Sequence, residues 1–414
     1  MMRATIPSSW AFSALLMIAA AFFAGGVMVH PHAAGTEARA DGFDKFVASM
    51  RVRARKNGIK RSVFDRAFKG VRPDPQVLKF ARYQPEFVSP VWAYIDKRVN
   101  DTRIANGRAK QQRHASLLRK LEKRYGIPQR YLLSIWGIES RYGEFKGDMS
   151  VIRSLATLGY RGRRAKFGRS QLMAALKILQ RGDIPLSQFT GSWAGAMGHT
   201  QFIPTTYNSY AVDWTGDGTR DIWNSVSDAL ASTGNYLRAS GWRRGQAWGI
   251  EVKAPKRLKV NRKKLGKSRS VASWVKLGVK PARGGKFGVW KRRAWLYSPS
   301  GKNGPAFLVY QNFRVIMKYN NSTSYALAVA LLGDRIAGKP DVIGKWPRSG
   351  TPLNQTGRIA IQQQLKRLGY YKGKVDGRVG SATEKAVRAY QKKIGVKPDG
   401  YPSVELLNRM RKGA

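Results

Sequence analysis

The sequence is 414 residues long and contains 76 Lys and Arg against 24 Asp and Glu, a formal net charge of +52. Its 43% hydrophobic content and 12 Trp are typical of a globular protein rather than a disordered basic tail. At about 100 to 200 residues per domain, we expect two or three domains. The absence of cysteine excludes disulfides, thiolate nucleophiles, Cys-ligated zinc and a lipoprotein anchor on an N-terminal Cys.

Residues 1–40 have the pattern of an export signal. Arg3 precedes an apolar run at 10–29, and small residues follow at Ala33-Ala34 and Ala38-Arg39-Ala40. The run exceeds the ~7 to 15 residues of a usual signal core, so an uncleaved inner-membrane anchor is the alternative. We therefore expect a periplasmic protein, for which the positive charge does not indicate a nucleic-acid partner.

Residues 41–240 show the apolar spacing of helices. Two sets of apolar residues, each on one helix face, are Phe43, Phe46, Val47 and Met50, and Leu117, Leu118, Leu121 and Tyr125. Pro128 suits the first turn of the helix that follows. This part of the chain is therefore predicted to be helical.

Residues 242–316 have a different texture, with short apolar runs between Gly, Pro and Lys clusters. We predict strands at 271–275, 287–290, 306–310 and 313–317. Residues 251–293 contain sixteen Lys or Arg and a single acidic residue, Glu251. The charge is thus concentrated in a β-rich insertion, which either contacts anionic envelope surfaces or is only a solvated face. Helical spacing returns at 324–336.

Residues 341–354 have the Pro, Gly and polar content of a linker, and residues 355–414 form a small C-terminal unit. Two Asp-Gly turns, Asp376-Gly377 and Asp399-Gly400, each precede a predicted helix, which indicates a weak internal repeat. Together with 368–373 and Tyr390-Gln391, these turns resemble the three-helix peptidoglycan-binding domain that is appended to cell-wall hydrolases. From the turns and packing faces alone, a structural appendage is the alternative.

Few residue types remain for catalysis. The sequence has no His-Glu-x-x-His motif, and only His114 and His199 lie beyond the expected signal, which disfavours zinc hydrolysis. Residues 191–195 lack the Gly-x-Ser-x-Gly order of a nucleophile elbow. Carboxylates are left, and carboxylates are the groups that cleave glycosidic bonds.

Glu139 is the candidate carboxylate, at the end of an apolar helical stretch that includes Trp136 and Ile138. Desolvation there is expected to raise the pKa of Glu139, as a general acid requires. The alternative is a Glu139 that faces solvent or pairs with Arg141. Residues 191–204 alternate glycines with aromatics, which suits either a wall against a sugar ring or a tight helix crossing.

The segments 137–143 and 191–204 together closely resemble the lytic murein transglycosylases of the B family, and the resemblance extends over residues 42–337. It implies a mainly α, lysozyme-like catalytic domain at 41–340 that cleaves the β-1,4 bond between N-acetylmuramic acid and N-acetylglucosamine and leaves 1,6-anhydromuramoyl ends. Glu139 matches the single catalytic acid and base of the family. The residues that match its saccharide-binding positions are Tyr94, Ser192, Gln201, Tyr236, Tyr319, Asn320 and Tyr325.

A hydrolytic muramidase and a non-catalytic cell-wall-binding or assembly protein are the alternative functions. A hydrolase needs a second carboxylate about 5 to 9 Å from the first. Neither motif supplies one, and the directions of Glu144 and Asp148 cannot be read from the sequence. We expect glycan strands of peptidoglycan as the partner, no required cofactor and a monomeric protein.

Residues 213–224 follow the spacing of an EF-hand calcium loop, a site that the resembled family can carry. The candidate ligands are Asp213, Thr215, Asp217, Thr219 and Asp228. Thr215 at loop position three and Asn224 at position twelve predict weak binding of a structural calcium ion. The alternative is an Asp-Gly turn held by its own hydrogen bonds.

Overall fold

The computed structural model describes residues 34–82, 90–258, 265–347, 350–351, 353–377 and 379–413. The apolar core of the expected signal, at 10–29, lies outside the described residues. The chain divides into two compact units, and each is described by itself. The first unit contains the chain up to Ala81, Asn106–Gly245 and Arg314–Val329, and the second contains Arg82–Ala105, Gln246–Phe313 and the chain from Ala330 onward.

The predicted mainly α fold is confirmed. The helices that lie wholly or partly in the first unit are α1 (Ala34–Lys56), α2 (Arg61–Phe68), α3 (Pro75–Arg82), α5 (Asp101–Arg113), α6 (Ala115–Tyr125), α7 (Gln129–Ser140), α8 (Val151–Tyr160), α9 (Ala165–Arg181), α10 (Pro204–Tyr210), α11 (Val226–Ala239), α13 (Gln311–Tyr319) and α14 (Thr323–Ile336). Two short strands, β1 (Met149–Ser150) and β2 (Thr190–Gly191), pair antiparallel. Within the described parts, no helix has both the length and the apolar character needed to cross a membrane.

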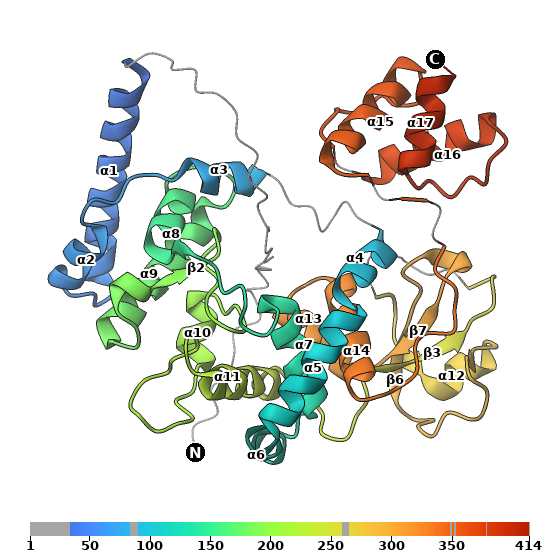
Figure 1. The fold of residues 1–414 in the computed structure, drawn as a ribbon, viewed down its shortest axis with the longest axis horizontal. Helices are drawn as coiled ribbons and strands as arrows, with labels where there is room; N and C mark the ends of the chain where they lie inside the picture. The colour runs from blue at the N-terminus through green and yellow to red at the C-terminus, as the bar shows by residue number, and fades with distance from the viewer. Residues whose placement is uncertain are drawn as a thin grey trace. The chain divides into compact units, whose positions relative to one another are not determined.

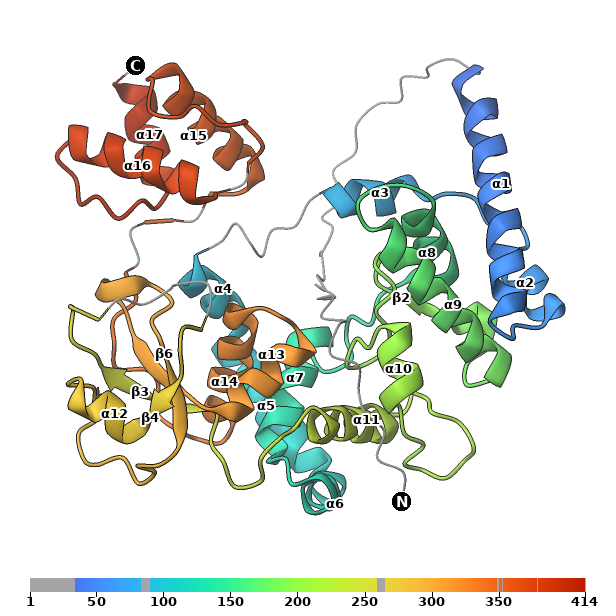
Figure 2. The ribbon, with the colours of Figure 1, turned by 180° about the vertical axis from the view of Figure 1, so that it is seen from behind.

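The core of the first unit lies around the pair α8 and α9, which run side by side (Figures 1 and 2). A Cβ atom on Gly168 of α9 would come within 2.4 Å of the backbone nitrogen of Gly159 in α8, so this close crossing requires glycine. The predicted apolar face of α1 is buried here through Phe43, Phe46 and Met50. The helical pattern read from these residues is therefore correct.

The second unit contains a five-stranded antiparallel sheet with the strand order β4-β6-β7-β3-β5. Its elements are α4 (Val91–Arg98), β3 (Gly249–Lys253), β4 (Arg269–Ser270), α12 (Val271–Lys276), β5 (Lys280–Pro281), β6 (Arg293–Tyr297) and β7 (Ala306–Val309). The register places Leu308 of β7 opposite both Ile250 and Leu296. Figures 1 and 2 show α12 beside this sheet.

The strand predictions in the insertion are partly wrong. The run 306–310 is confirmed as β7, but 271–275 lies in α12, 313–317 lies in α13, and 287–290 forms no strand. In α12 the Ser270 side chain accepts the backbone N–H of Ser273 and caps the helix. The buried residues Val271 and Trp274, three positions apart, then share one helix face. In so short an apolar run, this spacing does not distinguish a helix from a strand.

Glu251, the single acidic residue of the basic stretch, holds the start of the predicted linker. Its Oε2 accepts the backbone N–H of Ile343 at 2.9 Å, and its Oε1 accepts that of Gly344 at 2.7 Å. The same residues line a cavity of about 260 Å³ with the end of β3. The linker is thus attached to the β-rich insertion before it reaches the C-terminal helices.

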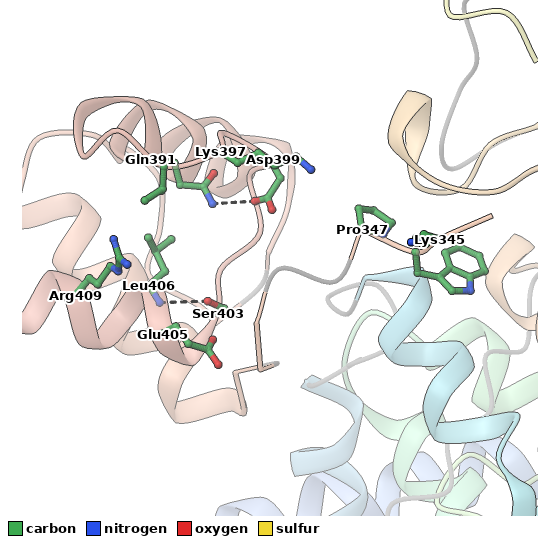
Figure 3. Close-up of a pocket in the computed structure, with 11 residues that line it drawn as sticks. Lys345, Pro347, Gln391, Lys397, Asp399, Ser403, Glu405, Leu406 and Arg409 are labelled. Atoms are coloured by element: carbon green, nitrogen blue, oxygen red, sulfur yellow. Dashed lines mark hydrogen bonds between the residues drawn. The ribbon is translucent and has the colours of Figure 1, made fainter. Parts of the chain in front are cut away.

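The C-terminal helices are α15 (Gln355–Arg367), α16 (Ser381–Lys393) and α17 (Val404–Lys412), as the three-helix prediction requires. A buried glutamine of the preceding helix holds each Asp-Gly turn. Gln362 accepts the N–H of Gly377 at 2.7 Å. Gln391 accepts the N–H of Gly400 at 2.8 Å and donates to Asp399 at 2.8 Å (Figure 3). These equivalent bonds give the internal repeat a structural basis.

We predict that Gln391→Met loosens the second turn, because it leaves the buried Gly400 N–H without its acceptor at a cost of about 1 to 3 kcal/mol. Amide hydrogen exchange in the full chain should become roughly tenfold to a hundredfold faster at residues 399–401. Gln363→Met, on the exposed face of α15, is the matched control and should leave this exchange unchanged. Unchanged protection in Gln391→Met would contradict the assignment.

Candidate active site

Glu139 lies in the last turn of α7, and every residue from Tyr131 to Ser140 of this helix is buried. The Glu139 side chain is only 6% exposed, so the alternative of a solvent-facing carboxylate is wrong. The helix ends because Arg141 and Tyr142 adopt left-handed backbone angles, with φ of 51° and 62°. Glu139 is thus held at the predicted helix end, away from water.

The Tyr325 hydroxyl donates a hydrogen bond to Glu139 Oε1 at 2.6 Å. Tyr325 is buried in the first turns of α14, and the ring of Tyr319 stacks on it with centroids 6.5 Å apart and an interplanar angle of 8°. Burial, together with the Glu139 carboxyl, raises the pKa of Tyr319 well above its usual value. Tyr319 therefore keeps its proton and acts as a donor.

Further aromatic residues join this pair to the glycine-rich segment. The Tyr319 hydroxyl donates to the Thr200 carbonyl at 2.6 Å. Its ring lies 5.8 Å from Phe202 and 5.2 Å from Tyr236, measured between centroids. Burial raises the pKa of Tyr236 to about 12, and its hydroxyl donates to the Lys318 carbonyl. The structure thus brings three predicted saccharide-binding residues, Tyr236, Tyr319 and Tyr325, into one cluster with Glu139.

Gln201 and Asn320 each present a buried acceptor. Gln201 has a left-handed φ of 55°, and its Nε2 donates to the carbonyls of Lys146 and Gly198 at 2.8 and 2.9 Å. Within the described part of the chain, Gln201 Oε1 and Asn320 Oδ1 have no hydrogen-bond partner. A buried unpaired acceptor costs about 1 to 3 kcal/mol, so a ligand that donates hydrogen bonds would be favoured at these atoms.

The other two predicted binding residues have different surroundings. Ser192 is half-buried, and its hydroxyl oxygen accepts the N–H of Ala196 at 3.1 Å, which closes a turn of the glycine-rich segment. Tyr94 lies in α4 of the second unit, where the Arg98 guanidinium carbon sits 3.6 Å from its ring centroid. Saccharide binding by Ser192 and Tyr94 stays a prediction.

Asp183 and Asp228 are the other buried carboxylates in the described residues, and both are engaged elsewhere. Asp183 pairs with Arg181 at 2.7 Å and Arg220 at 2.8 Å. Asp228 accepts backbone N–H groups of the 213–224 loop at 2.9 to 3.3 Å. Glu144 and Asp148 are exposed. Each of these carboxylates thus has either a structural role or a solvent-facing position.

The 213–224 loop is an Asp-centred turn in this structure. Asp213 accepts the N–H groups of Gly216 at 2.6 Å and Gly218 at 2.9 Å, and Asp217 accepts that of Thr219 at 2.9 Å. The Thr219 hydroxyl donates to Asp217 at 2.7 Å. No group of three or more acidic or histidine side chains is placed to hold a metal among the described residues. The loop carboxylates thus accept backbone N–H groups in this structure, and calcium binding by the loop stays a prediction.

His199 is a site residue that the sequence reasoning missed. Its ring Nδ1 accepts the indole N–H of Trp136, one turn before Glu139, at 3.1 Å. Burial lowers the pKa of His199 to about 4, aided by Lys146, Lys110 and His114 and opposed by Asp221. The one signal in the sequence was the position of His199 inside the glycine-rich segment 191–204. A polar ring buried there needs a hydrogen-bond partner.

We predict that the buried, neutral His199 lowers the free energy of unfolding as the pH falls. Its pKa is about 4 in the folded protein against 6.5 in the unfolded chain, so the unfolded state binds more protons between these values. The stability is therefore fully present above pH 6.5 and is lost as the pH falls towards 4, by roughly 3 kcal/mol. Denaturant unfolding at several pH values should show a shallower decline for His199→Asn than for the wild type, and equal slopes would count against this.

The sequence was compared with protein families and curated relatives. A model of the transglycosylase SLT domain family matches residues 42–334, and a model of a peptidoglycan binding domain matches residues 354–410. Membrane-bound lytic murein transglycosylase B of Escherichia coli (strain K12) is 31% identical over 258 residues, which cover 62% of this chain and 67% of the relative.

Solved structures give similar matches. SltB3 from Pseudomonas aeruginosa, in complex with NAG-anhNAM-pentapeptide, is 49% identical with a TM-score of 0.73, over 89% of this chain and 99% of that chain. Escherichia coli Slt35, in complex with calcium, is 27% identical with a TM-score of 0.62, over 72% of this chain and 92% of that chain.

Proposed function

The chain belongs to the family of lytic transglycosylases that carry the transglycosylase SLT domain and act on peptidoglycan, and we propose that Glu139 is its single general acid and base. The observation that carries the proposal is the buried Glu139 carboxyl beside the Tyr325 hydroxyl. The enzyme cleaves the β-1,4 bond between N-acetylmuramic acid and N-acetylglucosamine and forms 1,6-anhydromuramoyl ends. The anhydro sugar bound to SltB3 is consistent with this product.

In the proposed reaction, protonated Glu139 gives its proton to the glycosidic oxygen as the bond from that oxygen to C1 of the muramoyl residue breaks. The Glu139 carboxylate then removes the proton from the C6 hydroxyl of the same sugar as that oxygen bonds to C1. An internal nucleophile has a high effective concentration, so no water and no second carboxylate are needed. This agrees with the engagement of Asp183 and Asp228 elsewhere.

Tyr325 assists the carboxylate stage of this cycle. Its hydroxyl donates to Oε1, so we place the transferred proton on Oε2. A hydrogen bond to the charged form stabilises the carboxylate after it has protonated the leaving oxygen. The raised pKa of Glu139 that the sequence suggests stays a prediction.

We propose that the unpartnered oxygens of Gln201 and Asn320 accept hydrogen bonds from the hydroxyl or acetamido N–H groups of the glycan. The rings of Tyr236 and Tyr319 supply an aromatic face for a sugar ring. For Ser192, and for Tyr94 in the second unit, saccharide binding is proposed from the sequence resemblance alone.

We predict that Glu139→Gln lowers cleavage of purified sacculi at least about a thousandfold, because it removes both the acid and the base. Mass spectrometry of the digest distinguishes the functions. Anhydro ends in the wild type support transglycosylation, reducing ends would indicate a muramidase, and no release would indicate a binding protein. Glu144→Gln, at an exposed carboxylate, is the control that should stay active, and an active Glu139→Gln would overturn the assignment.

We propose the domain division 41–340 for catalysis, 341–354 for the linker and 355–414 for peptidoglycan binding. The match of residues 354–410 to a peptidoglycan binding domain supports it. A tethered binding domain raises the local concentration of glycan at the catalytic domain. Deletion of the residues beyond Leu353 should therefore weaken sacculus binding more than it slows cleavage of short glycans. Equal losses in both assays would place the unit in the catalytic core.

We also propose export to the periplasm through residues 1–40, with an uncleaved inner-membrane anchor as the alternative. The name of the Escherichia coli relative, a membrane-bound enzyme, is compatible with either. The basic β-rich insertion would contact anionic envelope surfaces, an attraction that salt weakens.

Lytic transglycosylases need no cofactor, and no step of the proposed reaction uses calcium. Weak structural calcium binding by the 213–224 loop stays a prediction from its spacing, and the Slt35 complex with calcium is the related case. In the conformation described, the Asp213 carboxylate of this loop accepts two backbone N–H groups.

A further inference from the structure

The turn that follows Glu139 is held in a strained backbone conformation. Arg141, Tyr142 and Gly143 have successive left-handed φ values of 51°, 62° and 93°. Two of these are not glycine, and such residues keep this conformation only where the surroundings enforce it. The position of Glu139 therefore depends on whatever restrains this turn.

His199 supplies two of the restraints. Its ring Nδ1 accepts the Trp136 indole N–H at 3.1 Å, and its carbonyl accepts the Ser140 hydroxyl at 2.5 Å. The Ser140 oxygen in turn accepts the N–H of Gly143 at 2.9 Å. These partners lie three positions before, one after and four after Glu139, so His199 is bonded to the helix end on both sides of the carboxylate.

The His199 ring packs closely against Gly143 and Trp136. A Cβ atom on Gly143 would lie 2.4 Å from Cε1 and Nδ1 of the ring. The Trp136 ring contacts both His199, at 5.6 Å between centroids, and Tyr142, at 5.6 Å, each edge to face. The ring is thus clamped between the turn and the helix.

The backbone of His199 also connects to the tyrosine side of the site. Its N–H donates to the Ile222 carbonyl at 2.9 Å, which ties the turn at 198–201 to the segment before α11. The next residue, Thr200, accepts the Tyr319 hydroxyl, and Tyr319 stacks on Tyr325, the donor to Glu139. Glu139 is therefore held by two sets of contacts, the hydrogen bonds to α7 and the contacts through Tyr319 and Tyr325. His199 takes part in the first set and is adjacent in the chain to Thr200 of the second.

We propose that His199 is a positioning residue for the transglycosylase reaction, which fixes the Glu139 end of α7 against the 198–201 segment through the Trp136 N–H and the Ser140 hydroxyl. This inference rests on the proposed role of Glu139. It requires a neutral imidazole with an acceptor at Nδ1, because an imidazolium would turn a second N–H towards the Trp136 donor.

The charges around the ring keep it neutral over the working range. Lys110, His114 and Lys146 disfavour a proton on His199, and Asp221 favours one. Burial adds to the three cations and brings the pKa to about 4. The hydrogen bond from Trp136 to His199 Nδ1 is consequently expected to break only in acid, near pH 4.

The test compares His199→Asn, which keeps an acceptor near the place of Nδ1, with His199→Leu, which does not. Full-length variants would be assayed on a soluble glycan at several pH values, with thermal unfolding to verify the fold. We expect His199→Leu to lower kcat about tenfold to a hundredfold with KM changed less than about threefold, since misplacement of a catalytic group by an ångström costs rates of this order. His199→Asn should keep most of the wild-type kcat at neutral pH. It should lack the fall in kcat that we expect of the wild type as the pH drops towards 4, because asparagine does not titrate.

Trp136→Phe removes the donor and keeps a ring, so it should lower kcat as His199→Leu does. The double variant with both substitutions should lose no more kcat than either single variant. Wild-type kcat in His199→Leu, equal losses in the Asn and Leu variants, or additive losses in the double variant would overturn the positioning role. Glu139→Gln separates the two proposals, because retained activity there sinks the role of Glu139 whatever His199 does. Should His199→Leu fail to fold, the Asn variant and Trp136→Phe still decide the question through kcat and the pH profile.

Discussion

The hydrogen bond from Tyr325 to Glu139 joins side chains 186 residues apart, and the candidate active site depends on it. A carboxyl can be buried only where donors replace the water it has lost. Tyr325 supplies one, and its own position is set by Tyr319, which is bonded to the backbone at Thr200. The helix that carries Glu139 and the segment that carries Tyr325 thus have to meet before the site exists.

Aromatic side chains do most of this positioning. Tyr236 and Tyr319 are partly buried, pack their rings against the core and are fixed by hydroxyls that donate to backbone carbonyls. Trp136 is buried and is fixed by its indole N–H, which donates to the ring Nδ1 of His199. Because Tyr and Trp combine a large apolar ring with a polar tip, they can fill a core and still specify one orientation.

The positive charge of the chain has a local counterpart in Glu251. The sheet that carries the basic stretch holds this acid where two backbone N–H groups of the linker reach it. A carboxylate is the natural acceptor for such donors. The one negative charge of residues 251–293 thus has a structural use, while most of the basic side chains that the structure describes in this stretch are exposed.

The sequence by itself determined the helical class, the three C-terminal helices and the candidate acid Glu139, because periodic burial and punctuation by Gly and Pro are local properties. It was wrong at 271–275 and 313–317, where five-residue stretches with four apolar residues are compatible with strand or helix and only packing selects one. The pairing of Glu139 with Tyr325 and the role of His199 were decided by the tertiary structure alone. Hydrogen bonds between residues that are distant in the chain leave no periodic trace in a single sequence, since their partners become neighbours only when the core closes.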